Sequence, residues 1–198
     1  MTKLNRAEIA VKGAAAALVA LAGAAKAQDL QGLYGGLSYS KGSGAAVDSN
    51  DTYSFDGNAG GAFIGYNFVQ GDWLFGAELA FSNGGYDSTY PNDAPYMTVE
   101  NTRDIKARVG RVFGKTVVYG VVGRSTMDID MFGPNQTGAD GDATATTLGL
   151  GFETAIGAKA FVGGEYLTRD LDLSDGPAYY ANGGADLNTL SLRMGLRF

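Results

Sequence analysis

Two residue types that carry much of protein chemistry are missing from this chain, which contains no cysteine and no histidine. Without cysteine there can be no disulfide and no thiolate metal site. Without histidine, the commonest general base and the commonest imidazole ligand for zinc are excluded. We therefore expect no catalytic residues, no cofactor and no metal site, and we do not expect an enzyme.

The sequence also lacks a long apolar run. The run at 13–23 (GAAAALVALAG) has 11 residues, whereas a helix that spans a bilayer needs about 20. This run follows three basic residues and precedes Ala25-Lys26-Ala27, which is the order of features in a secretory signal peptide. We predict a signal peptide over 1–27 with cleavage between Ala27 and Gln28. The alternative is an amphipathic N-terminal helix of a soluble protein.

Basic residues are scarce in the rest of the chain. Four of the 15 basic residues and one of the 21 acidic residues lie in 1–27. Residues 28–198 therefore keep 11 basic and 20 acidic residues, a net charge of −9. Such a chain is a poor partner for nucleic acid, which is bound by clustered Lys and Arg. Since no later stretch approaches a transmembrane helix, residues 28–198 could cross a membrane only as a closed barrel.

Glycine is abundant, at 31 residues, and argues against a helical protein because each Gly in a helix interior costs about 1 kcal/mol relative to Ala. Strict alternation of apolar and polar residues is present instead, and it is clearest at the C-terminus. There every even position is apolar and every odd position is polar or small, which predicts a strand with two different faces. The apolar positions are Leu190, Leu192, Met194, Leu196 and Phe198.

The same period of two recurs in seven earlier segments, so we predict eight strands. They lie at about 33–40, 61–68, 73–81, 100–113, 117–124, 147–156, 160–166 and 190–198. In the fifth segment both faces carry apolar residues. We assign Val117, Tyr119 and Val121 to its outer face, which turns Arg124 inward. Strands of roughly ten residues suit a tilted strand that crosses a bilayer.

The predicted connections alternate between short turns and long loops. The short turns fall at 69–72, 114–115 and 157–158, and the long loops at about 41–54, 82–96, 126–142 and 168–185. Outer-membrane barrels have this asymmetry, with short periplasmic turns and longer extracellular loops. The fold class that we predict for 28–198 is therefore all-β, an eight-stranded antiparallel up-and-down transmembrane β-barrel.

Aromatic residues on the apolar face fall near both ends of the predicted strands. Such girdles are typical of the two water–lipid interfaces, although a soluble β-sandwich could instead hold these aromatics in its core. Those near the loop ends are Tyr39, Phe81 and Tyr166, and those near the turn ends are Phe68, Trp73, Phe113 and Phe198.

The opposite face carries both signs of charge, which in a barrel this small would fill the interior. It includes five acidic residues, Glu100 and Asp104 among them, and five basic residues, Arg197 among them. Because buried charges need partners, we predict a network of ion pairs across the lumen. Its predicted members are Glu78, Lys106, Arg108, Arg124, Glu153, Glu165 and Arg193. The network is either a rigid plug or a narrow gate that opens when the pairs exchange.

The long loops are rich in Asp, a residue that favours turns. Asp-x-Asp pairs at 128/130, 140/142 and 170/172 also suggest binding of a divalent cation, either specifically or as loose bridging to lipopolysaccharide.

The chain resembles the small outer-membrane β-barrel proteins of proteobacteria, in particular the opacity/porin-like family. The resemblance rests on the signal ending Ala25-Lys26-Ala27, the first strand Gly-Leu-Tyr-Gly-Gly at 32–36 and the ending Arg197-Phe198. It implies location in the bacterial outer membrane and makes Phe198 the signal that the barrel-assembly machinery reads. The Trp that many members carry before the Gly-Tyr motif is absent here.

From these features we expect a monomer with a structural or surface-interaction role. Its partners would be outer-membrane lipid, lipopolysaccharide and, during biogenesis, the barrel-assembly machinery. The alternatives are a narrow porin-like channel for small solutes and an adhesin that uses the acidic loops.

Overall fold

The structure is a computed structural model that describes residues 30–47, 52–89, 95–132, 138–172 and 184–198. The predicted signal peptide and its cleavage site lie outside these residues. Within the described part of the chain, no helix is long and apolar enough to cross a membrane.

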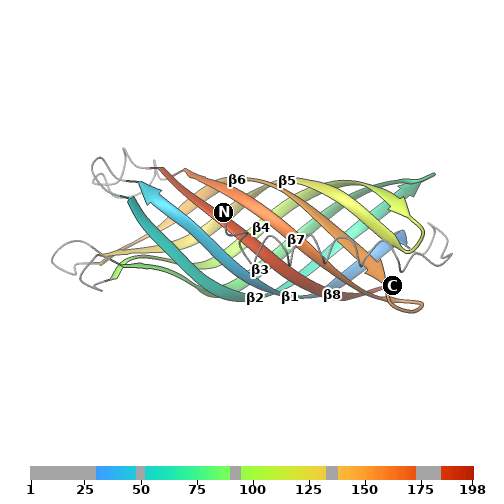
Figure 1. Cartoon of the computed structure of the whole chain (residues 1–198), viewed down its shortest axis with the longest axis horizontal. Helices are drawn as coiled ribbons and strands as arrows, with labels where there is room; N and C mark the ends of the chain where they lie inside the picture. Colours follow the sequence, from blue (N-terminus) through green and yellow to red (C-terminus); the bar gives the residue numbers. More distant parts are fainter. Residues whose placement is uncertain (1–29, 48–51, 90–94, 133–137, 173–183) are drawn as a thin grey trace, which may run out of the picture.

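The described residues form eight antiparallel strands that close into one barrel. Figure 1 shows the strands inclined to the long axis, each beside its neighbour in sequence, with β8 beside β1. The predicted fold class is confirmed. The strands are β1 (Gly32–Val47), β2 (Thr52–Gln70), β3 (Trp73–Thr89), β4 (Pro95–Phe113), β5 (Thr116–Phe132), β6 (Gly138–Ala155), β7 (Ala160–Asp172) and β8 (Gly184–Arg197).

The strands are longer than predicted, with 13 to 19 residues each. Bilayer crossing needs only about 9–11 residues, so the barrel continues past its apolar band at the loop end. The prediction of loops at 41–54, 82–96, 126–142 and 168–185 is therefore wrong over much of each range. Alternation persists there with small or polar residues, a weaker signal than the apolar alternation nearer the turns.

Glycine forms two of the tight turns at the other end. Gly71 and Gly114 each begin a two-residue turn with φ of +62°, a conformation that side-chain-bearing residues rarely adopt. The turn at Gly114 pairs Val112 with Val117, so both point to the same side. Both are buried. The facing that we predicted for the fifth segment is thus wrong, since residues at odd positions of β5 point inward.

The outward face forms a continuous apolar band. The large apolar residues that face outward on β8, and Phe198 directly after it, are more than half exposed, up to 71% for Leu192 and Phe198. The predicted aromatic residues at both ends of the strands are exposed as well. A soluble protein rarely exposes a large apolar patch, so this band fits lipid and does not fit the core of a soluble sandwich.

The interior is filled in layers along the barrel axis. An apolar cluster that includes Leu74, Val112 and Val117 closes the turn end. Charged and hydroxyl side chains occupy the middle. A second apolar cluster fills the extension at the loop end, with Phe55, Met127 and eleven other buried residues. The charged residues of the lumen are therefore enclosed by apolar layers on both sides.

Candidate functional site in the barrel interior

Glu78 lies at the centre of the charged layer. Its carboxylate forms ion pairs with Lys106 Nζ at 2.8 Å, Arg108 Nη1 at 2.9 Å and the guanidinium of Arg193. The hydroxyl of Tyr34 donates a further hydrogen bond to Glu78 Oε2 at 2.7 Å. All of these residues are less than 5% exposed. Three cations thus share one carboxylate that water barely reaches.

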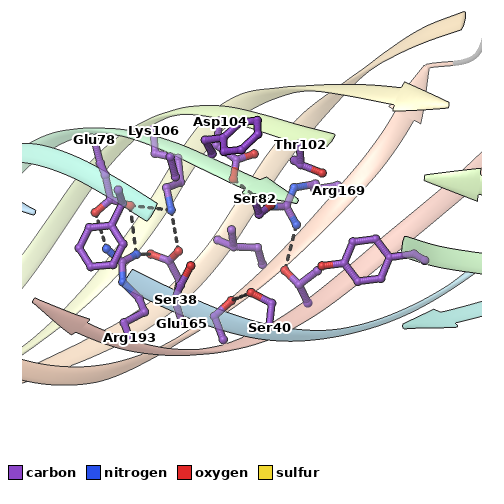
Figure 2. Close-up of a pocket in the computed structure, with 17 residues that line it drawn as sticks. Ser38, Ser40, Glu78, Ser82, Thr102, Asp104, Lys106, Glu165, Arg169 and Arg193 are labelled. Carbon is purple, nitrogen blue, oxygen red and sulfur yellow. Dashed lines mark hydrogen bonds and ion pairs between the residues drawn. The ribbon is translucent and has the colours of Figure 1, made fainter. Parts of the chain in front are cut away.

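Two other carboxylates complete the network. Glu165 accepts from Lys106 Nζ at 2.6 Å, and its other oxygen pairs with Arg193 Nη1 at 2.6 Å. Glu153 pairs with Arg108 Nη2 at 2.8 Å and with Arg197 Nη2 at 3.4 Å. Figure 2 shows Glu78, Lys106, Glu165 and Arg193 gathered at one end of a cavity.

Aromatic rings hold the arginines in place. The Arg108 guanidinium lies 3.9 Å from the ring centroid of Tyr119, and that of Arg193 lies 4.0 Å from the centroid of Phe63. Such cation–π contacts strengthen when water is excluded. Glycine makes room for a ring, because a Cβ at Gly151 would lie 2.4 Å from the Tyr119 ring. Together the ion pairs and rings connect residues from all eight strands.

A second polar layer lies nearer the loop end, around Asp104 and Arg169. Arg169 Nη2 pairs with Asp104 Oδ2 at 2.9 Å, while Arg169 Nε donates to Ser125 Oγ at 3.0 Å. Arg169 Nη1 donates to Thr189 Oγ1 at 2.9 Å. The loop predicted over 168–185 includes Arg169, so the predicted network lacks this residue, whereas β7 continues to Asp172 and turns it into the lumen. Arg169 shares the inward face of β7 with Leu167 and Leu171, both of them buried, and this continued period of two was the signal for a longer strand.

A small cavity separates the two polar layers. Its volume is about 30 Å³, enough for one or two water molecules. Hydroxyl groups of Ser38, Ser40, Ser82 and Thr102 are among its lining, as Figure 2 shows. A space of this size does not form a passage for solutes.

Six of the seven residues predicted for the network lie together, and Arg124 does not. Arg124 is exposed on the outer face of β5, because the tight turn at Gly114 fixes the opposite facing. Its Nη2 donates to Thr144 Oγ1 at 2.9 Å. The prediction of Arg124 in the lumen is therefore wrong.

Glu100 also lies outside the lumen, contrary to its predicted facing. An irregularity in the β4–β5 pairing between Val99 and Thr102 changes the alternation, so both Val99 and Thr102 are buried while Glu100 is exposed. The charged residues of the lumen in the described strands are Glu78, Asp104, Lys106, Arg108, Glu153, Glu165, Arg169, Arg193 and Arg197. Four acids and five bases leave the interior with one excess positive charge.

The polar groups of this interior form ion pairs and hydrogen bonds with one another. In the described ranges, no group of three or more acidic side chains is placed to hold a metal ion. Each carboxylate of the charged layer already binds two or more cationic groups. The arrangement cross-links the strands and fills the lumen.

The family model for the outer membrane protein beta-barrel domain matches residues 13–198. Among curated proteins, a 22 kDa outer membrane protein of Rhizobium leguminosarum bv. viciae is 26% identical over 162 residues, which covers 74% of this chain and 68% of that protein.

Solved structures of small barrels are similar in fold. Neisserial surface protein A matches with a TM-score of 0.51 and 15% identity, covering 84% of this chain and 97% of that one. Ail, the attachment invasion locus protein of Yersinia pestis, matches with a TM-score of 0.49 and 17% identity. The match covers 85% of this chain and 99% of Ail. The family match, the apolar outer band and the closed barrel agree, and the chain belongs to the outer membrane protein β-barrel domain family of the bacterial outer membrane.

Proposed function

We propose that this protein is a non-enzymatic, monomeric barrel that holds a rigid, acidic surface outside the outer membrane for structural or adhesive contacts. The signal peptide over 1–27 and its cleavage between Ala27 and Gln28 belong to the same proposal. The observation that carries it is the filled interior: apolar layers lie on both sides of a charge network whose carboxylates are shared among several cations. An interior of this kind favours a scaffold over a channel.

The extension beyond the apolar band supports a role at the cell surface. Its inner side is packed by apolar residues, as in the core of a folded domain. Its outer side carries exposed acidic residues on several strands, namely Asp56, Asp87, Glu100, Asp142, Asp170 and Asp186. The extension therefore presents a packed, negatively charged outer surface beyond the apolar band. Variants shortened in the segments that connect the strands at the loop end should lose binding to host or neighbouring cells. Unchanged cell binding would contradict the adhesive part of the proposal.

We predict that the folded protein gives no stable single-channel current in planar bilayers, because the lumen has no continuous polar path. Recordings on wild type, Glu153→Ala and Arg124→Ala would test this. Glu153 lies inside the lumen and Arg124 outside it. A steady wild-type current that changes with Glu153→Ala but not with Arg124→Ala would show a pore through the lumen and would overturn the proposal.

Phe198 is proposed as the assembly signal. It is the terminal residue of the alternating β8 segment and is 71% exposed on the outer face, where another protein can contact it. Deletion of Phe198 should reduce the amount of folded protein in the outer membrane several-fold while export to the periplasm continues. Quantitative blotting of fractionated cells measures both amounts. Deletion of an exposed residue such as Ala158 in the β6–β7 turn serves as the control, and equal outer-membrane levels for the two deletions would contradict this role.

A further inference from the structure

The outward face changes from apolar to polar at a definite level on every strand. Beyond the apolar band, toward the loop end, the first outward residue other than tyrosine with a polar side chain is basic or neutral on every strand. These eight residues, in strand order, are Lys41, Asn58, Asn83, Arg103, Arg124, Thr146, Thr168 and Asn188. We call them the boundary belt.

Acidic residues face outward only beyond the boundary belt at this end. On β2 Asp56 lies two residues past Asn58, on β7 Asp170 lies two past Thr168, and the other strands follow the same order where they carry acids. The three charged residues of the boundary belt are all basic, although the whole chain has 21 acidic and only 15 basic residues. A belt whose own charged residues are all basic fits contact with anionic groups.

Two arginines of the boundary belt are neighbours on adjacent strands. In the β4–β5 register Ile105 pairs with Arg124 and Arg103 pairs with Thr126, so the two arginines are diagonal neighbours. Diagonal positions on one face lie about 7–8 Å apart, a span across which two long guanidinium side chains can reach one phosphate. Arg103 is anchored by two hydrogen bonds to Asp128, at 2.8 and 3.1 Å.

Arg124 forms no ion pair within the described strands, so its guanidinium is open to an outside partner. Within the described strands its one polar contact is the hydrogen bond to Thr144 Oγ1, and no carboxylate lies within ion-pair distance of it. Two exposed apolar residues are cross-strand partners of these arginines: Phe81 pairs with Arg103 and Ile105 with Arg124, and they are 47% and 68% exposed. The two guanidinium groups thus lie where lipid acyl chains end and headgroups begin.

We propose that Arg103 and Arg124 bind a phosphate group of a phosphorylated glycolipid in the outer leaflet, while Phe81 and Ile105 contact its acyl chains. Guanidinium groups suit phosphate because they donate paired hydrogen bonds and remain charged in a partly apolar setting. This inference rests on the proposed orientation, in which the loop end is extracellular. It adds a defined lipid contact on the outer wall, separate from the filled lumen.

The test measures stabilisation of the folded, full mature protein in neutral detergent by bisphosphorylated lipid A. A ligand that binds only the folded barrel raises its unfolding midpoint in proportion to binding. We expect lipid A to raise the midpoint of the wild type, and we expect at least tenfold more lipid A to be needed for the same rise in the Arg103→Gln/Arg124→Gln variant. Arg124→Gln alone should show most of the loss, and it keeps the Arg103–Asp128 contact intact.

The control variant Arg111→Gln/Lys115→Gln removes the same charge from the turn end and should respond to lipid A as the wild type does. Dephosphorylated lipid A and free inorganic phosphate should each give less than a tenth of the effect. An equal response in the Arg103→Gln/Arg124→Gln variant, or an equal effect of dephosphorylated lipid A, would overturn the lipid site. Neither result would bear on the conductance measurement, so the scaffold proposal is tested separately.

Discussion

Glu78→Gln is expected to lower the free energy of unfolding by about 3–5 kcal/mol, the typical cost of removing one partner from a buried ion pair. Glu78 binds Lys106, Arg108 and Arg193, and all four side chains are 2% exposed or less. The lumen already contains one more base than acid. With the carboxylate removed, three cations would remain in a space that holds at most one or two waters, and repulsion among them would add to the loss.

Urea titration in lipid vesicles would measure this change, with the folded fraction read from migration on unheated gels. Glu100→Gln is the matched control, because it removes the same charge from an exposed position on the outer face of β4. Its effect should stay within about 0.5 kcal/mol. A Glu78→Gln protein as stable as the Glu100→Gln protein would show that the network does not hold the strands together.

Met194→Arg is expected to destabilise the inserted barrel by about 2–4 kcal/mol, the cost of an arginine at the lipid-facing midplane. Met194 is the middle residue of the apolar series from Leu190 to Phe198 on β8 and is 60% exposed. Its cross-strand partners are Leu37 and Val162, neither of which could neutralise an added charge. We also expect a lower yield of assembled protein, since the barrel must insert this strand into lipid.

Asn188→Arg on the same strand provides the comparison. Asn188 belongs to the boundary belt, where the cost of an arginine falls to about 0–1 kcal/mol. Comparing the free energies of unfolding of the two variants in vesicles therefore tests whether the cost of an arginine depends on its depth in the bilayer. Equal losses of stability would mean that the apolar face of β8 is not in lipid.

The alternation of β8 was sufficient to predict its facing, because five apolar residues share one side without interruption. The fifth segment was assigned wrongly because Val and Tyr occur on both of its faces. The information to correct it was present in the Gly114–Lys115 turn, since a two-residue hairpin forces Val112 and Val117 onto the same side. Turn geometry is thus a better guide than apolarity where both faces are apolar.

Other features depend on contacts that are distant in sequence. The pairing of Arg193 with Glu78 joins residues 115 positions apart, and it follows from the strand tilt and stagger that close the barrel. Asp104 and Arg169 form a pair only because β7 continues to Asp172. The irregularity near Glu100 has no clear signal in composition, and it alone decides that this carboxylate lies outside the lumen.

The central claim is that apolar side chains on one side of each strand contact lipid while those on the other side fill the lumen. The chain contains a single tryptophan, Trp73, so a Trp73→Phe background allows one tryptophan reporter to be placed at a time. Phe75→Trp places the reporter on the outer face and Phe63→Trp places it on the inner face. The wild-type side chains at these positions are 42% and 6% exposed. In vesicles with bromine-labelled acyl chains, fluorescence of the tryptophan at 75 should be strongly quenched and that of the tryptophan at 63 should be nearly unaffected. Equal quenching at both positions, or quenching at 63 alone, would contradict the account.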